Sequence, residues 1–246
     1  MGLLRIILNG GNWISIVSCL ISSAIVVFLV MPVHEYAHGF AAGKLGDPTP
    51  RWQGRMTLNP MAHVDYMGAL MIFLIGFGWA RPVQVDSRYF NNPKRDMAIT
   101  ALAGPLSNLI FSLLACLLRN ACYFIFLKNG MIFEYLEFTN GYMPESFWHL
   151  VLYLVMLIFE YIAFINISLA VFNLIPIPPL DGSKILAAVL PERIYWQIMR
   201  YERYFYFALI FLLFFGSGFS NFLGRLVSLI FDLVFKLTWF PFDLFL

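Results

Sequence analysis

The sequence predicts an all-α protein that crosses a membrane several times. Its 246 residues are 61% hydrophobic and only 12% charged, whereas a typical soluble domain carries about 25% charged residues. The apolar residues come in blocks long enough to cross a bilayer as a helix, which takes about 20 residues. One water-soluble core that buried them all would leave too little polar surface, so we expect an integral membrane protein.

Four long apolar blocks account for most of the predicted membrane helices. They are Trp13–Gly43, Met97–Leu118, Trp148–Phe172 and Tyr204–Phe219. With a final apolar helix, the total is about five membrane helices. The segment Gly68–Trp79 is apolar but short and interrupted by glycine, which is typical of a segment that re-enters the membrane without crossing it.

Turn-forming residues fill the polar stretch Lys44–Asp65 and leave room for a short strand at Arg55–Leu58. A second alternating stretch, Arg81–Val85, also reads as a strand. We therefore expect a small β-hairpin or sheet near the functional site. No soluble domain or linker interrupts the chain, so we expect a single domain over residues 1–246, with a catalytic core at about 13–190 and C-terminal membrane or interfacial helices at about 204–246.

Charged residues of the last segment recur with the period of a helix. They are Arg225, Asp232, Lys236 and Asp243, and they fall on one narrow stripe. The remaining side chains of this helix are mainly large and apolar. The stripe either lies at the membrane interface, which we favour, or faces the helix bundle.

The distribution of basic residues predicts the orientation in the membrane. Eleven of the 16 lysines and arginines lie in three regions, residues 44–55, 81–95 and 184–203, whereas the loop 119–149 has two basic residues and the acidic Glu134, Glu137 and Glu145. The positive-inside rule places the three basic regions in the cytoplasm and the loop outside. No basic run of the kind that binds nucleic acid is present, so we expect no nucleic-acid partner.

The residues His34, Glu35 and His38 fit the pattern H-E-x-x-H on a helix. Spacing of i, i+4 puts both imidazoles on one face, where their nitrogens can share one zinc ion, and Glu35 can take a proton from a metal-bound water. Lys44 is ten residues beyond His34, so His34 lies about 15 Å from the expected membrane surface. Two histidines and a glutamate are costly at that depth and point to function rather than to a helix contact.

A catalytic zinc site needs one more protein ligand, and Asp181 is the best candidate. It follows the segment Asn173–Leu180, which contains Pro176, Pro178 and Pro179. Three prolines exclude a helix there, so we expect extended, partly unpaired backbone lining a cavity. Taken alone, Asp181 fits the cap of a helix that starts near Ser183 equally well.

Together these motifs resemble the site-2 protease family of intramembrane zinc metalloproteases. The matching residues are His34-Glu35-x-x-His38, Leu58-Asn59-Pro60-x-x-His63-x-Asp65, Gly78-Trp79-Ala80-Arg81-Pro82-Val83, Ala103-Gly104-Pro105-x-x-Asn108 and Asn173-x-x-Pro176-x-Pro178-x-Leu180-Asp181-Gly182. The resemblance covers about residues 33–182 and is closest to the compact bacterial and archaeal members, which lack a PDZ or regulatory domain.

The resemblance implies a polytopic fold with its active site inside the bacterial or archaeal cell membrane, near the cytoplasmic face. It implies one zinc ion per chain on His34, His38 and Asp181, with Glu35 as general base. The substrates would be single-span membrane proteins, cut within or near their transmembrane segments, with Asn173 holding the substrate backbone or the developing oxyanion.

Three interpretations remain open from the sequence. Asn108 is a candidate substrate-binding residue, although packing of its helix through small residues explains it equally well. His63 is either a turn contact or a transient ligand. A membrane metal transporter or a non-catalytic scaffold is the alternative function, but a transporter needs no general base, so Glu35 favours hydrolysis.

Overall fold

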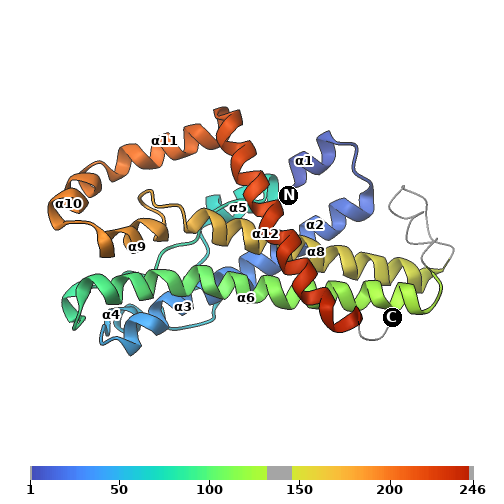
Figure 1. The fold of residues 1–246 in the computed structure, drawn as a ribbon, viewed down its shortest axis with the longest axis horizontal. Coiled ribbons are helices and arrows are strands. Elements are labelled where there is room, and N and C mark those ends of the chain that lie inside the picture. Colours follow the sequence, from blue (N-terminus) through green and yellow to red (C-terminus); the bar gives the residue numbers. More distant parts are fainter. Residues whose placement is uncertain (1, 132–145, 244–246) are drawn as a thin grey trace.

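The computed structural model describes residues 2–131 and 146–243, and nearly all of the regular structure is helical (Figure 1). The helices are α1 (Leu3–Leu8), α2 (Trp13–Ile25), α3 (Met31–Lys44), α4 (Thr49–Trp52), α5 (Tyr66–Ile75), α6 (Pro93–Lys128), α8 (Phe147–Asn173), α9 (Asp181–Val189), α10 (Glu192–Arg200), α11 (Glu202–Phe215) and α12 (Ser217–Asp243). The acidic residues of the loop used above to predict orientation lie outside the described residues.

Three helical segments are long and apolar enough to cross a membrane, namely Trp13–Lys44, Pro93–Lys128 and Phe147–Asn173. They match the first three predicted blocks. The fourth block differs, because α11 has only 14 residues and reaches about 21 Å, less than the roughly 30 Å of a bilayer core. The expected number of five membrane helices is therefore not reproduced by length and composition among the described residues.

The first span is one continuous helical rod with a wide turn in its middle. α2 begins at Trp13, where the Asn12 side chain accepts a hydrogen bond from the Ser15 amide at 2.9 Å. A π-helical turn, Val26–Val30, then joins α2 to α3. Single π turns are rare and occur often at functional sites. This one lies four residues ahead of His34.

The short apolar segment forms α5, whose 10 residues reach about 15 Å and cannot span a bilayer. Asp65 caps its start by accepting hydrogen bonds from the amides of Met67 and Gly68. Gly76 ends it with φ of 75°, a left-handed conformation that glycine adopts without strain. The helix is therefore shorter than the predicted segment Gly68–Trp79.

The predicted strands at Arg55–Leu58 and Arg81–Val85 are wrong. Among the described residues, pairing of the β type is limited to one isolated antiparallel bridge between Val64 and Ala80. The Arg81 amide donates to the His63 carbonyl at 2.7 Å, and the Val83 amide donates to a side chain, Glu35. Pro82, between them, has no N–H. Three consecutive residues therefore have no free amide to donate to a partner strand.

The loop around His63 is held together by its own polar contacts. The His63 imidazole is fully buried and its Nε2 lies 2.8 Å from the Thr57 carbonyl oxygen. A carbonyl only accepts, so this nitrogen donates. Arg55 reaches the Ala62 carbonyl in the same loop. The contacts agree with the turn interpretation of His63.

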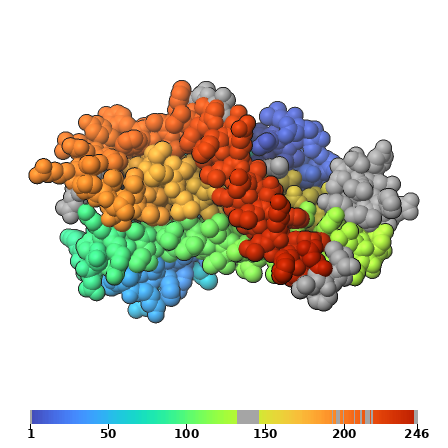
Figure 2. All heavy atoms as spheres, viewed as in Figure 1, coloured from blue at the N-terminus to red at the C-terminus, as the bar shows by residue number. Residues whose placement is uncertain are grey.

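α12 runs diagonally across α6 and α8 (Figures 1 and 2). Its buried residues Val227 and Val234 pack with Ala163, Ile167 and other side chains of the bundle. The four charged residues of the predicted stripe are all exposed. The stripe thus faces away from the bundle, which rules out the alternative that it lines the helix core.

Polar contacts fix α12 and the neighbouring helices to each other. The fully buried Asn120 of α6 donates to Thr238 Oγ1 at 3.0 Å and to the Phe235 carbonyl at 3.3 Å. Arg119 Nε lies 3.4 Å from Glu160 Oε2 of α8, and its guanidinium lies 4.7 Å from the centre of the Phe235 ring. Arg119 is thus the partner that the sequence could not name for Glu160.

The contact between Asn120 and Thr238 should contribute measurably to stability. We expect Asn120→Leu to lower the free energy of unfolding in detergent by about 0.6–2 kcal/mol, the range found for hydrogen bonds between membrane helices. Denaturation followed by circular dichroism measures it. The same substitution in a Thr238→Val background should cost less, because the partner is already gone; an equal cost in both backgrounds would contradict the assignment.

Candidate metal centre

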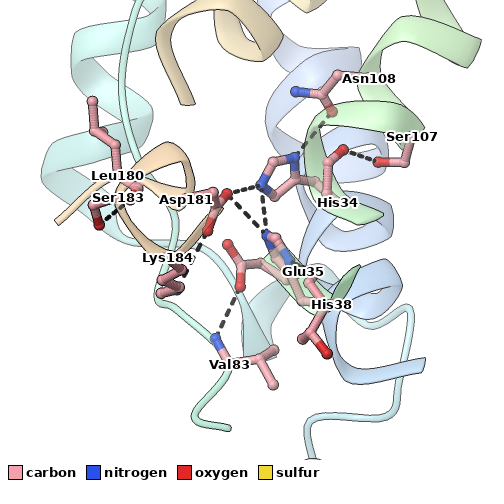
Figure 3. Close-up of polar contacts among 12 residues, drawn as sticks. His34, Glu35, His38, Val83, Ser107, Asn108, Leu180, Asp181, Ser183 and Lys184 are labelled. Carbon is pink, nitrogen blue, oxygen red and sulfur yellow. Dashed lines mark hydrogen bonds and ion pairs between the residues drawn. The ribbon is translucent and has the colours of Figure 1, made fainter. Parts of the chain in front are cut away.

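α3 brings His34, Glu35 and His38 to one buried site (Figure 3). The two imidazoles are one helical turn apart, and their Nε2 atoms lie 3.1 Å from each other. Their rings are nearly perpendicular, with centres 4.8 Å apart. Both Nε2 atoms therefore point to the same place.

The other ring nitrogens are held by α6. Nδ1 of His38 lies 2.8 Å from the carbonyl oxygen of Thr100, and Nδ1 of His34 lies 3.3 Å from Oδ1 of Asn108. A carbonyl only accepts, so Nδ1 of His38 carries the proton and its Nε2 keeps a lone pair. The Asn108 contact favours the same tautomer for His34. Metal-binding histidines are commonly oriented in this way.

Gly104 allows α6 to approach the histidines closely. A Cβ atom at this position would lie 2.3 Å from Nε2 of His38 and 2.7 Å from Cε1 of His34. Thr100, Gly104 and Asn108 follow one another at four-residue spacing and so share one face of α6. Thr100 and Gly104 were not predicted to lie at the histidines, because their spacing from Asn108 shows only that the three residues share one face of α6.

Asp181 reaches the same point from another part of the chain. Its Oδ2 lies 3.1 Å from Nε2 of His38 and 3.6 Å from Nε2 of His34, while its Oδ1 lies 3.3 Å from Lys184 Nζ. α9 begins at Asp181 itself, with Leu180 as the capping residue and no side-chain cap. Asp181 therefore contacts the histidines and does not cap the helix.

The residues 174–180 that lead to Asp181 form successive turns, not the extended backbone that the prolines suggested. Hydrogen bonds close them, from the Ile175 amide to Phe172 O at 3.1 Å and from the Leu180 amide to Ile177 O at 3.0 Å. Proline is compatible with turns as well as with extended chain. The turns bring Asp181 back beside the end of α8.

Surrounding charge keeps the Asp181 carboxyl ionised. Burial alone would raise its pKa, but the positive charges of His38, when its ring is protonated in the absence of a metal ion, and of Lys184 lower the pKa well below its usual value. An ionised carboxylate is the form that binds a metal ion. The network thus prepares Asp181 as a ligand.

The three side chains fit a zinc ion. One atom from each of His34, His38 and Asp181 can be chosen so that all lie within 4.8 Å of one another. The closest donor pairs are 3.1, 3.1 and 3.6 Å apart, and ligands of a tetrahedral zinc ion with bonds of about 2.0–2.1 Å lie about 3.3 Å apart. Three acceptors that converge in this way repel one another unless a cation is between them.

Glu35 faces the same cavity without joining the three ligands. Its Oε2 accepts a hydrogen bond from the Val83 amide at 2.9 Å, and the side chain is buried. This contact fixes the carboxylate beside the metal-binding group. Val83 was part of a quoted motif, but no sequence pattern showed that its amide would hold Glu35.

A cavity of about 250 Å³ surrounds this group. The predicted site residues on its wall are His34, Glu35, His38, Asn108, Asn173 and Asp181. Asn173 is the last residue of α8 and is half-buried. The structure thus brings every predicted site residue to one cavity. Lys184 is a further polar residue on its wall.

Comparison with known proteins agrees with this chemistry. Residues 22–216 match the model of peptidase family M50. “Putative zinc metalloprotease YwhC” of Bacillus subtilis is 34% identical over 192 residues, which cover 78% of each chain. “Putative zinc metalloprotease Rip2” of Mycolicibacterium smegmatis is 27% identical over 159 residues, 61% of this chain and 50% of that protein. No solved structure matches.

The matched region contains the histidine pair, the aspartate, most of the first apolar span and the whole of the other two. A family match of this length, together with the first relative, settles the classification. The chain belongs to peptidase family M50, the site-2 protease family, and is a zinc metallopeptidase integral to a membrane.

Proposed function

We propose that the protein is an intramembrane protease that hydrolyses peptide bonds within or near the transmembrane segments of single-span membrane proteins. His34, His38 and Asp181 hold the zinc ion, and Glu35 is the general base. The observation that carries the proposal is the buried carboxylate of Glu35 on the wall of the cavity where the three ligands converge.

Each residue has a distinct task in this mechanism. The zinc ion, when bound, polarises the scissile carbonyl and acidifies water. Glu35, oriented by the Val83 amide, takes the proton from the attacking water and passes it to the leaving amine. Thr100 and Asn108 orient the imidazoles through their Nδ1 atoms. We therefore assign Asn108 to His34 and not to direct contact with substrate.

The walls of the cavity suggest how substrate is held. A helical substrate hides its amides, so it must unwind before it is cut. Asn173 offers two amide donors and one acceptor to an unwound backbone, and it lies on the wall of the same cavity. The segment Pro82–Val85 contributes another wall. The Val83 amide is bonded to Glu35. An unwound substrate that paired with this segment like a neighbouring β-strand would therefore have to use its other backbone groups.

We further propose that the cavity opens near the cytoplasmic side of the membrane. The three basic regions 44–55, 81–95 and 184–203 fall on α4, the start of α6, α9 and α10, which lie at the same end of the molecule (Figure 1). The positive-inside rule assigns such an end to the cytoplasm. We also propose one domain, with the core at about 13–190 and the C-terminal helices at about 204–246.

A metal transporter or a non-catalytic scaffold is the alternative function. It would explain the three ligands but not a buried glutamate held beside them. Burying an ionisable group in a membrane bundle is costly unless it serves the site. Hydrolysis accounts for all four residues.

Metal content is the first test. Purified in detergent, the protein should hold about one zinc ion per chain, and His38→Ala or Asp181→Ala should lose most of it. Zinc is measured by atomic emission on folded protein. His149→Ala, a histidine outside the cavity, is the matched control and should keep its zinc. Full retention in Asp181→Ala would remove Asp181 from the ligand set.

Removal of the base is the second test. Glu35→Gln should keep its zinc and its fold but lose about 10²-fold or more in the rate of cleavage of a model transmembrane substrate, because an amide cannot accept the proton. Glu202→Gln, in the first turn of α11, should cleave normally. Near-normal cleavage by Glu35→Gln would exclude the catalytic role of Glu35, whereas absence of cleavage by the wild type would favour the transporter.

Asn173 can be tested separately from the metal. Asn173→Ala should reduce cleavage by an amount equivalent to about 2–4 kcal/mol if the amide acts like an oxyanion donor, and leave zinc content unchanged. Asn221→Ala, an exposed asparagine of α12, is the control. If cleavage by Asn173→Ala falls only in step with lost zinc or lost folding, Asn173 is structural.

A further inference from the structure

A second cavity lies next to the catalytic cavity and shares two residues with it. It has a volume of about 180 Å³ and lies among the end of α5, α8, α12 and the start of α1. The two residues common to both cavities are Phe77 and Phe172. No role has been assigned above to this second space or to the two phenylalanines.

Two separate stretches of chain pass from one cavity to the other at this pair. On one stretch Ile75 lines the second cavity and Trp79 lines the catalytic cavity, with Phe77 between them. On α8, Phe164, Ser168 and Val171 line the second cavity, Leu169 and Asn173 line the catalytic cavity, and Phe172 lines both. The phenylalanines therefore mark the boundary on both walls.

The two rings fill that boundary. Their centres are 4.0 Å apart and their planes are tilted by 59°, which is closer than the separation of about 4.5–7 Å usual for aromatic pairs, so the two rings are in tight contact. Gly76 precedes Phe77 with φ of 75°, and a Cβ on Gly78 would lie 2.0 Å from the Gly68 carbonyl oxygen. The backbone on both sides of Phe77 is thus fixed, whereas its ring can rotate about its own side-chain bonds.

The second cavity is mostly apolar, although the charged side chain of Arg5 also lies on its wall. Its wall on α12 consists of Leu223, Gly224 and Val227, and its wall on α8 includes Phe164 and Val171. Ser168 bonds the Phe164 carbonyl of its own helix at 2.8 Å and offers its hydroxyl proton to no ligand. An apolar cavity of about 150 Å³ can hold a benzene ring, so this one is large enough for an aliphatic or aromatic side chain.

We propose that the second cavity is a substrate subsite, which receives an apolar side chain of the transmembrane segment near the scissile bond, and that Phe77 and Phe172 separate it from the metal centre. The inference rests on the proposed function. Its support is that the two cavities adjoin at this pair of rings, which favours a single occupant that extends from one into the other. The pair would then determine which side chains are accepted.

Gly224 allows the subsite to be filled without touching the metal centre. It lies on the second cavity but not on the first, and an added Cβ would meet no atom within 4 Å. Gly224→Leu should therefore fold and occupy the cavity. Gly218 lies on the same helix, is equally open and lines neither cavity. Gly218→Leu is the matched control.

The experiment compares two probes, a model single-span substrate in liposomes and a peptide reduced to the few residues around the same scissile bond. Gly224→Leu should lower kcat/KM for the single-span substrate by about tenfold or more, since a filled pocket rejects a side chain by that order. Cleavage of the short peptide and zinc content should stay within twofold of wild type. Gly218→Leu should change none of these quantities.

Several results would overturn the subsite. One is that Gly224→Leu matches Gly218→Leu on both probes. Another is that Gly224→Leu slows both probes equally, which would mean that it disturbs the catalytic cavity or the fold. A photo-reactive benzophenone side chain at position 227 of the Glu35→Gln protein should also cross-link the substrate. Labelling of lipid alone would assign the cavity to an acyl chain. Failure of the wild type to cleave either probe would instead reject the proposed function, and the subsite with it.

Discussion

The contact between α3 and α6 is the constraint on which the site depends. Two imidazoles and a carboxylate are placed so that their lone pairs converge, and this arrangement is stable only if the rings cannot turn away. α6 prevents that by accepting from both Nδ1 atoms and by presenting Gly104 where any side chain would collide with the rings. The geometry of the metal ligands is therefore a property of helix packing, and not of the H-E-x-x-H helix alone.

The membrane location explains why so much polar structure is concentrated in a few places. In a bilayer, polar side chains without partners are costly, and helix association has no hydrophobic driving force. Polar contacts accordingly serve two uses here: some hold helices together, as in Asn120 with Thr238, and others order the candidate metal centre. Arg119 and Glu160 illustrate the first use, and Glu35 with the Val83 amide the second.

The pairing of His34 with His38 and the three spans could be predicted from the sequence because each follows a local rule, whereas Asp181 was singled out by the family resemblance and not by its own spacing. Helical spacing paired His34 with His38, and block length located the spans. The strand at Arg81–Val85 could not be excluded in this way, since its amides are taken by His63 and Glu35, which are remote in sequence. For the same reason the partner of Glu160 and the role of Gly104 became visible only when α6 was placed beside α8 and α3.

The π-helical turn at Val26–Val30 has a consequence for how the first span can evolve. It accommodates one more residue than an ordinary turn, so the helix after it is rotated by about 100° relative to an uninterrupted α-helix. The face that packs on α8 before the turn and the face that carries His34 and His38 after it are therefore set independently. Loss of a single apolar residue there would keep the hydrophobicity and length of the span almost unchanged, yet turn the histidines away from Asp181.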